Sequence, residues 1–485
     1  MERLLRSSFR YQNCRRPELS GHWPWLLALL PALGLILLLA GVDSLARADP
    51  APTAPSPAVA AAPCNVSGFV TTDTTWGPAI CDPYVVIGTI VITNGVTLTI
   101  EPGTMVKFNS LKALTVQGTL VARGAAANLI TFTSNVGQGK GDWGYIYFTD
   151  SSADATFDDD GNYTGGSVIQ YAVIEYAGGG EEGGALRIEA STPFVDHNTI
   201  QYNQAGGIQA GHVDGIIITN NLVSNNTGSG ISVSGINPYS LTQVTILNNT
   251  IISNTGSGIS AYFNAATIGN NTIMGNTANN GGGLEVVYGT AIINNNTITG
   301  NTASSGGGGI YTTFGTSTTI SNNVIAGNTA AWGGGLFVQY GEHTISNNSI
   351  TNNTGYYGGG IYSADNTSVT IQNNTISGNT AYAGGGIDSD SNSAIIVSDN
   401  TIISNTADDS AGGMYLMCFL STYTATINNN VIVANTAGQK HLGGGIYLAG
   451  RCRPLINDND LYGNLTGNPA RFPNDLYEGN VYSET

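Results

Sequence analysis

A short motif recurs through most of the chain, and its period limits what the chain can fold into. The motif is an isoleucine or leucine followed by an asparagine three residues later, and it returns every 22 to 30 residues. Repetition at this period is typical of solenoids, in which every repeat packs only on its neighbours. The asparagines of the motif stand at positions 203, 225, 254, 276, 301, 328, 353, 379, 405, 435 and 464.

Each repeat contains three short runs with the character of β-strands. In one repeat they are Ala291–Ile293, Thr297–Thr299 and Gly309–Thr312, each bounded by Asn or Gly. Such runs are too short for a helix–strand repeat, and 66 glycines exclude a mainly helical protein. The sequence therefore predicts an all-β fold, a single parallel β-helix of three short strands per coil and about a dozen coils. Each strand would pair with its equivalent about 4.8 Å away.

The repeated residues have structural roles in this fold. The isoleucine of the motif would point into the narrow core, and the asparagine would occupy a turn. There its amide would hydrogen-bond the asparagines of the coils above and below, forming a ladder. The glycines before each third strand would allow a positive φ or close contact between coils. We therefore interpret these residues as structural, although Asn-x-Thr also resembles a glycosylation signal.

The opening of the repeat region resembles a known group of proteins. GTIVITNGVTLTIEPGTMVKF, LTVQGTLVARG and ITFTSN are followed by Gly141–Gly144 (GDWG) and Ile174–Gly178 (IEYAG). These stretches are similar to the first coils of secreted right-handed parallel β-helix proteins of the pectate-lyase-like superfamily. The resemblance covers about residues 84–470 and implies right-handed coils and a polysaccharide as partner or substrate. The later GGGI and IxxN elements are similar to the repeats of polymorphic outer-membrane proteins.

The first residues have the order of an export signal. Five arginines precede an apolar run from Trp23 to Ala40, and Ala46–Ala48 (ARA) reads as a cleavage site. An uncleaved N-terminal anchor is the alternative, and it would be the chain's only contact with a membrane. Both alternatives predict a secreted or cell-surface protein. We expect a signal or anchor at 1–48, a Pro/Ala-rich linker at 49–63, a cap and first coils at 64–190, the repetitive β-helix at 191–470 and a capping tail at 471–485.

Four of the five cysteines lie in the exported part of the chain. In an oxidising compartment they predict two disulfides. Cys64 and Cys81 are near neighbours at its start, and Cys418 and Cys452 lie near its end. We therefore predict the pairs Cys64–Cys81 and Cys418–Cys452.

The charge of the chain restricts its partners. The formal net charge is -17, with only 15 Lys and Arg residues, which argues against a nucleic-acid partner. No Lys or Arg occurs between Arg187 and Lys440. The lyases of the resembled superfamily use an Arg or Lys base, so this gap argues against such chemistry in the central coils. The hydrolase motifs of that superfamily occur here only as near misses in reversed order, and we transfer no catalytic residue from them.

Some acidic residues are nevertheless candidates for a site. Period-two alternation places Asp388 and Asp390 on one outward face, about 6.5–7 Å apart at Cα. Paired carboxylates at this spacing can perform acid–base hydrolysis of a glycoside, and solvated surface acids or a calcium site are the alternatives. Glu175 and Glu189 form a second acidic group nearer the N-terminal coils. The loop of Asp158, Asp159 and Asp160 is a candidate for Ca²⁺, although it lacks the full EF-hand spacing.

Aromatic residues recur at equivalent outward positions. An exposed stripe of rings would form a platform on which sugar rings stack, and a ladder that only stabilises the coils is the alternative. The residues after the glycine clusters are Tyr311, Phe337, Tyr362, Tyr415 and Tyr447, and those just before them are Trp332, Tyr356, Tyr357 and Tyr382.

Two classes of function follow. The first is an exported, non-catalytic β-helix that binds glycans or surfaces, as an adhesin or envelope component. The second is a polysaccharide hydrolase or lyase. We favour the first because the catalytic motifs are missing, and we expect a monomer because the C-terminal tail would cap the last coil.

Overall fold

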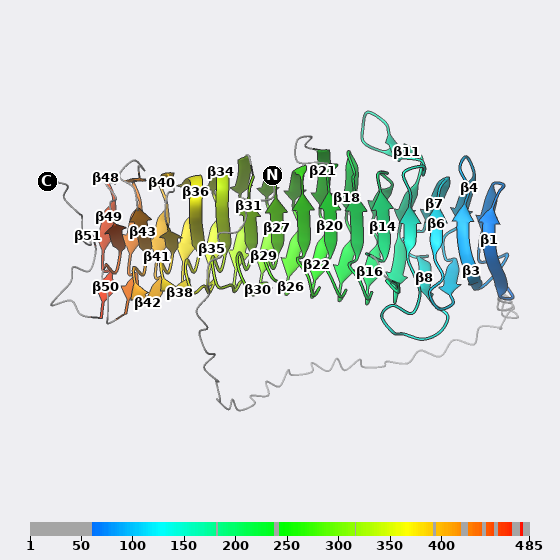
Figure 1. Ribbon diagram of the computed structural model, residues 1–485, viewed down its shortest axis with the longest axis horizontal. Coiled ribbons are helices and arrows are strands. Elements are labelled where there is room, and N and C mark those ends of the chain that lie inside the picture. The colour runs from blue at the N-terminus through cyan, green and yellow to red at the C-terminus, as the bar shows by residue number, and fades with distance from the viewer. Residues whose placement is uncertain are drawn as a thin grey trace, which may run out of the picture. The chain divides into compact units, whose positions relative to one another are not determined.

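The computed structural model describes residues 61–180, 183–236, 242–315, 317–390, 394–418, 425–438, 443–450, 454–467 and 476–478. The described residues form strands and turns and include no helix. The predicted parallel β-solenoid is confirmed, with about 14 turns rather than a dozen. Figure 1 shows the coils stacked in chain order from β1 (Cys64–Val70) to β51 (Leu476–Glu478). The predicted segment 1–48, nearly all of the linker 49–63 and most of the tail 471–485 lie outside the described residues.

Each coil contributes one strand to each of three parallel sheets. Sheet 1 contains β6 (Leu114–Val116), β9 (Ile146–Phe148), β14 (Leu186–Glu189), β17 (Ile208–Gly211), β20 (Ile231–Ser234), β23 (Ile259–Tyr262), β27 (Leu284–Val287), β31 (Ile310–Thr313), the first halves of β34 (Leu336–Ser346) and β36 (Ile361–Gln372), β39 (Ile387–Ser389), β43 (Met414–Cys418), β47 (Ile446–Gly450) and β51. Sheet 2 contains β2 (Thr74–Trp76), β4 (Thr97–Ile100), β7 (Thr119–Arg123), β12 (Val168–Gln170), β15 (Phe194–Asp196), β18 (Ile216–Thr219), β21 (Thr242–Leu247), β24 (Asn264–Gly269), β28 (Thr290–Asn294), β32 (Ser317–Ser321), the second halves of β34 and β36, β40 (Ala394–Ser398), β44 (Ala425–Asn428) and β48 (Leu455–Asn457). Sheet 3 contains β5 (Met105–Phe108), β8 (Ile130–Ser134), β13 (Ala172–Glu175), β16 (Thr199–Gln201), β19 (Leu222–Ser224), β22 (Thr250–Ile252), β25 (Thr272–Met274), β29 (Thr297–Thr299), β33 (Val324–Ala326), β35 (Ser349–Thr351), β37 (Thr375–Ser377), β41 (Thr401–Ile403), β45 (Val431–Val433) and β49 (Asp460–Tyr462).

A few strands lie outside this scheme. β1 and β3 (Tyr84–Ile92) begin both sheet 3 and sheet 1, because the two halves of β3 pair with β1 on one side and with β5 and β6 on the other. The hairpin of β10 (Thr156–Phe157) and β11 (Tyr163–Gly165) projects from an early coil. Short strands that follow sheet 3 form further parallel ladders: β26 (Thr277–Ala278), β30 (Thr302–Ala303), β38 (Thr380–Ala383), β42 (Thr406–Ser410), β46 (Thr436–Ala437) and β50 (Leu465–Thr466).

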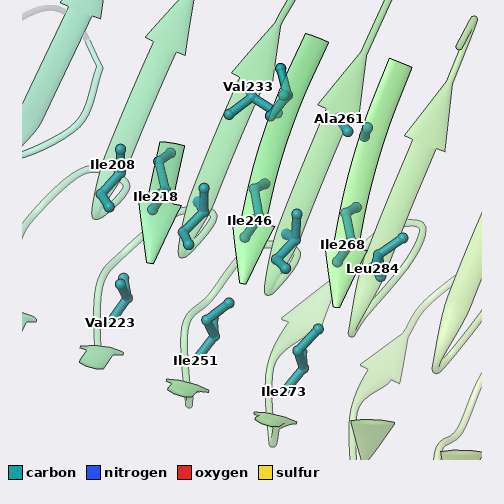
Figure 2. Close-up of a cluster of buried hydrophobic side chains, with 14 of the residues drawn as sticks. Ile208, Ile218, Val223, Val233, Ile246, Ile251, Ala261, Ile268, Ile273 and Leu284 are labelled. Carbon is teal, nitrogen blue, oxygen red and sulfur yellow. The ribbon is translucent and has the colours of Figure 1, made fainter. Parts of the chain in front are cut away.

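The core is the narrow space between the three sheets. One coil contributes Ile208 from sheet 1, Ile218 from sheet 2 and Val223 from sheet 3, and all three are fully buried. Figure 2 shows the equivalent residues of the next coils aligned with them in rows. These rows continue from coil to coil. Because successive residues of a strand point to opposite faces, the residues between the core positions point outward and are available for a site.

Two ladders of buried asparagines hold the corners beside sheet 3. In the predicted ladder, the backbone N–H and the Nδ2 of Asn276 both donate to Oδ1 of Asn301, at 2.9 and 3.1 Å. The ladder is confirmed with one shift, since Asn226 rather than Asn225 occupies its position and Asn225 is the turn residue before it, with φ 56°. The second ladder was not separated from the first by the sequence motif, and it contains Asn198, Asn221, Asn249, Asn271, Asn296, Asn323, Asn348, Asn374, Asn400, Asn430 and Asn459.

One of the two predicted disulfides is confirmed. Cys64 and Cys81 are bonded, with their Cα atoms 5.6 Å apart. Cys452 lies outside the described residues, so the pair Cys418–Cys452 stays a prediction.

Candidate functional site

The outward positions of sheet 1 carry a ladder of aromatic rings. Tyr311, Phe337 and Tyr362 are paired in register on β31, β34 and β36. Their successive ring centroids are 4.9 and 5.4 Å apart. Further along, Tyr415 of β43 stacks on Tyr447 of β47 with centroids 5.2 Å apart. The rings thus have the ladder geometry that was the alternative to an open platform.

A carboxyl group interrupts this ladder at β39. Asp388 is paired with Tyr362 on one side and with Tyr415 on the other. Adjacent strands lie about 4.8 Å apart, so the two tyrosines are separated by about two strand spacings. The short aspartate side chain fills less of that interval than an aromatic ring would.

A second aromatic row is interrupted in the same coil. Trp332 and Tyr357 precede β34 and β36 at equivalent positions, and the next residues in that row are Ala383 and Ser410. Small side chains therefore replace the outer rings where Asp388 replaces the inner ring. Because both rows lack an aromatic ring at this coil, the surface of sheet 1 is open there.

The result is a pocket of about 440 Å³. It lies toward the C-terminal end of the solenoid, where Figure 1 shows β36, β38, β42 and β43 in yellow to orange. Aromatic rings and carboxyl groups dominate its walls. The described lining residues are Trp332, Tyr357, Tyr362, Tyr382, Ala383, Asp388, Asp390, Asp409, Ser410, Tyr415, Met417 and Tyr447.

The inner rings of the ladder are more deeply covered than predicted. Phe337 and Tyr362 are each only 8% exposed, so the expectation of a continuous exposed stripe is wrong for them. Trp332 and Tyr357 pack against this pair from outside. The glycine turn also lies close by, because a Cβ added at Gly358 would come within 2.8 Å of the Cβ of Tyr362.

The rim of the pocket carries the rings that solvent reaches. Tyr356 and Tyr382 are 53% and 38% exposed, and their rings stack at 4.8 Å. Tyr357 meets both rings edge-on. Of these three, Tyr357 and Tyr382 line the pocket.

Asp388 is the chemically distinctive residue of the pocket. The alternative of a solvated surface acid is wrong for Asp388, since it points outward but is only 2% exposed between the neighbouring rings. Its Oδ1 has no hydrogen-bond partner among the described residues. Burial, and then the charge of Asp390, raises the pKa of Asp388 well above its usual value. Asp388 is therefore poised to hold a proton, and to donate a hydrogen bond, at a pH where ordinary aspartates are ionised.

Two further carboxyl groups line the same pocket. Asp390 follows Asp388 by two residues, and the hydroxyl of Tyr362 donates to its Oδ2 at 3.4 Å. Asp409 was not among the predicted site residues. It lies where β42 carries an extra residue relative to β38, so that Asp408 and Asp409 oppose the single Tyr382. The sequence signal was the one-residue lengthening between Thr406 and Gly412, compared with Thr380 and Gly385.

The structure does not bring the other acidic candidates to this pocket. Glu175 lies on sheet 3, where the hydroxyl of Thr133 and the amide of Gln201 donate to it at 3.0 and 3.2 Å. Glu189 lies on β14 of sheet 1, eight strands from β39 in the ladder of that sheet, and contacts His212 at 2.5 Å. Neither glutamate shares a site with Asp388.

The candidate calcium loop is an exposed turn. Backbone and side-chain N–H groups of Asn162 donate to Asp158 and lower its pKa. Within the described ranges, no three His, Cys, Asp or Glu side chains come together as metal ligands. Asp158, Asp159 and Asp160 are therefore adjacent in sequence without converging on one point.

Fold and sequence together define the class of the protein, a right-handed parallel β-helix. Residues 145–302 and 267–417 match the family described as right handed beta helix region. These matches span more than half of the chain, so the chain belongs to the right-handed β-helix family, and the handedness implied by the resemblance is confirmed.

Some solved structures show a distant likeness to this chain. The A-module of mannuronan C-5 epimerase AlgE6 from Azotobacter vinelandii is 12% identical, with a TM-score of 0.27, over 84% of this chain and 91% of that one. The GH136 lacto-N-biosidase of Eubacterium ramulus is also 12% identical, with a TM-score of 0.27, over 75% of this chain and 63% of that one. No curated protein matches the sequence significantly. The described residues include no helix long and apolar enough to span a membrane.

Proposed function

We propose that this protein is an exported β-helix that binds a saccharide in the pocket between Tyr362 and Tyr415. The observation that carries the proposal is the double interruption of the aromatic rows around Asp388. It creates a hollow of about 440 Å³, which lies within the range of about 300–1,000 Å³ common for small-ligand sites. The partner is a polysaccharide or a cell-surface glycan, and the protein works outside the cytoplasm as a monomer.

The walls of the pocket have the two chemical characters that a sugar needs. The C–H faces of a sugar ring are apolar and pack on aromatic rings such as those of Tyr362 and Tyr415. The hydroxyl groups at its edge need polar partners, which the carboxyl groups of Asp388 and Asp390 supply. A ring seated between the tyrosines would continue the ladder and lie beside Asp388, whose Oδ1 has no hydrogen-bond partner among the described residues.

A rim substitution tests this proposal without disturbing the ladder. Tyr382 is exposed and lines the pocket, so Tyr382→Ala should leave folding intact and lower glycan affinity about tenfold, the effect of losing one aromatic contact. The measurement is titration calorimetry with oligosaccharides selected on a glycan panel. Tyr288→Ala is the matched control, because Tyr288 is 43% exposed and stacked between Phe263 and Phe314 outside the pocket. Equal affinity of both variants and the unaltered chain would contradict the proposal.

A glycoside hydrolase is the second candidate function. The observation that favours it is the raised pKa of Asp388 beside a second carboxyl group, Asp390, because hydrolysis needs one protonated and one ionised carboxyl. Reducing ends should then appear when neutral and acidic polysaccharides are incubated with the protein, with or without Ca²⁺. Asp388→Asn should abolish the release, whereas silence of the unaltered protein across a broad panel would leave binding as its function.

A further inference from the structure

We infer that the saccharide bound between Tyr362 and Tyr415 carries a protonated amine, as an unacetylated amino sugar does. This inference rests on the proposed function and names the class of ligand that the pocket selects. Neutral and anionic sugars are the alternatives that the test below separates from it.

The first argument is the charge of the pocket lining. Asp388, Asp390 and Asp409 all line the hollow, and its described lining residues include no Lys, Arg or His. Negative charge on these carboxyl groups repels an anionic ligand and attracts a cationic one. The chain as a whole has a formal net charge of -17, so its long-range field also favours the approach of cations.

The second argument is the condition of Asp388. Asp388 lines the hollow but is only 2% exposed, and its Oδ1 is buried without a hydrogen-bond partner among the described residues. A buried carboxylate is costly unless a proton or a positive group compensates it. An ammonium group supplies both a hydrogen bond and the compensating positive charge, whereas a neutral hydroxyl supplies a hydrogen bond without that charge. Asp388 therefore gains more from an amine than from any neutral sugar.

The third argument is the kind of side chain that surrounds the carboxyl groups. Trp and Tyr rings attract cations through their negative faces, and the effect is largest where water is excluded. Trp332, Tyr357, Tyr362 and Tyr415 line the same pocket as Asp388. Carboxyl groups enclosed by aromatic rings are the combination by which proteins recognise amines. The half-buried glutamate of the same row, Glu285, lacks this arrangement because Tyr262 and Ser260 already donate to its Oε2 at 2.9 and 3.2 Å.

The test compares three trisaccharides of one linkage on the unaltered full-length protein. They are the β-1,4 trimers of glucosamine, N-acetylglucosamine and glucose, titrated calorimetrically at about pH 6, where the sugar amine is protonated. We expect the glucosamine trimer to bind about tenfold or more tightly than the other two, and this preference to shrink in high salt. Equal affinities, or tighter binding of a neutral trimer, would overturn the inference and leave saccharide binding intact. No binding of any trimer would overturn the inference as well, and the glycan panel then decides the proposed function separately.

Two variants test whether Asp388 causes the preference for the glucosamine trimer. Asp388→Asn should remove most of the preference for glucosamine, measured as the ratio of the affinities for the glucosamine and glucose trimers. Glu285→Gln is the matched control, because Glu285 is a half-buried carboxyl of the same outward row outside the pocket. This variant should prefer glucosamine as strongly as the unaltered protein does. Preservation of the full preference in Asp388→Asn would contradict the role given to this residue. The comparison of ligands on the unaltered chain stands even where a variant does not fold.

Discussion

Asp388 and Glu285 show how one outward position supports two different chemistries. Both are carboxyl groups on the first outward row of sheet 1, and burial is the main cause that raises the pKa of each. Two hydroxyl groups of the same sheet donate to Glu285, whereas Asp388 lines a hollow and its Oδ1 has no hydrogen-bond partner among the described residues. The difference lies in the neighbours, since Ala383 and Ser410 stand in the outer row where earlier coils carry rings. A buried carboxyl becomes a candidate site only where the fold leaves it something to bind.

His343 makes the stability of the solenoid dependent on pH. It is 2% exposed, and burial lowers its pKa from 6.5 to about 4. Between these values the unfolded chain binds a proton that the folded chain does not. The free energy of unfolding should therefore fall as the pH drops from about 6.5 to about 4, by about 3 kcal/mol in total. Urea unfolding followed at several pH values measures this slope.

The chain itself supplies the control for His343. Thr318 and Val369 hold the equivalent position in the two adjacent coils, so His343→Val fits the local geometry. The variant should lose the part of the slope between pH 6.5 and 4 that belongs to the histidine. An unchanged slope would show that other groups cause the acid sensitivity.

At the scale of the strand, the period-two alternation correctly predicted which side chains point outward. It did not predict how exposed those side chains are. The period of two placed Asp388, Phe337 and Tyr362 on the outward side of sheet 1, where they are. Their burial was not predictable from alternation, because it comes from rings and glycine turns that pack over the strand from outside. Asp409 was missed for a related reason. Asp409 lies at a one-residue bulge of β42 and lines the pocket. The periodicity of a strand does not show where the residues of a bulge point.

The interruption of the ladder at Asp388 predicts that a ring placed there will raise the stability of the solenoid and abolish glycan binding. Asp388→Tyr would restore the missing ring between Tyr362 and Tyr415 and would remove a buried carboxyl. We expect the free energy of unfolding to rise by about 1–2 kcal/mol, since aromatic neighbours across strands stabilise a sheet and buried carboxyl groups are costly. Glycan binding should disappear because the ring fills the hollow.

Thermal unfolding and titration calorimetry on the same preparation check both halves of this prediction. Phe337→Tyr is the control, because it alters a ring of the continuous part of the ladder and leaves the pocket lining unchanged. Retained glycan binding in Asp388→Tyr would place the ligand elsewhere. A loss of stability would show that the ladder cannot accept a ring at this coil.

At the scale of the whole molecule, the repeat made the fold predictable and the site hard to find. Every coil contacts chiefly the coil before and the coil after it, so one motif read from the sequence specifies the sheets, the core rows and the asparagine ladders together. The pocket is the place where three rows of that pattern change in two adjacent coils, at Ala383 and Asp388 in one and at Asp409 in the next. Each change is a single residue, and the sequence does not show that the three meet until the coils are stacked.

The same one-dimensional arrangement predicts how the solenoid fails when its first coil is weakened. The disulfide Cys64–Cys81 closes a loop with a sequence separation of 17, and a loop of this size is worth about 3 kcal/mol by the chain-entropy model. Because distant coils share no contacts, the double variant Cys64→Ala and Cys81→Ala should lose protection from hydrogen exchange in β1, β2 and β3 alone, while β27, β31 and β36 keep theirs. Reduction of the unaltered protein should reproduce the same local loss. A uniform loss of protection along the solenoid would contradict the nearest-neighbour account, since it would require the first coil to stabilise coils that it never touches.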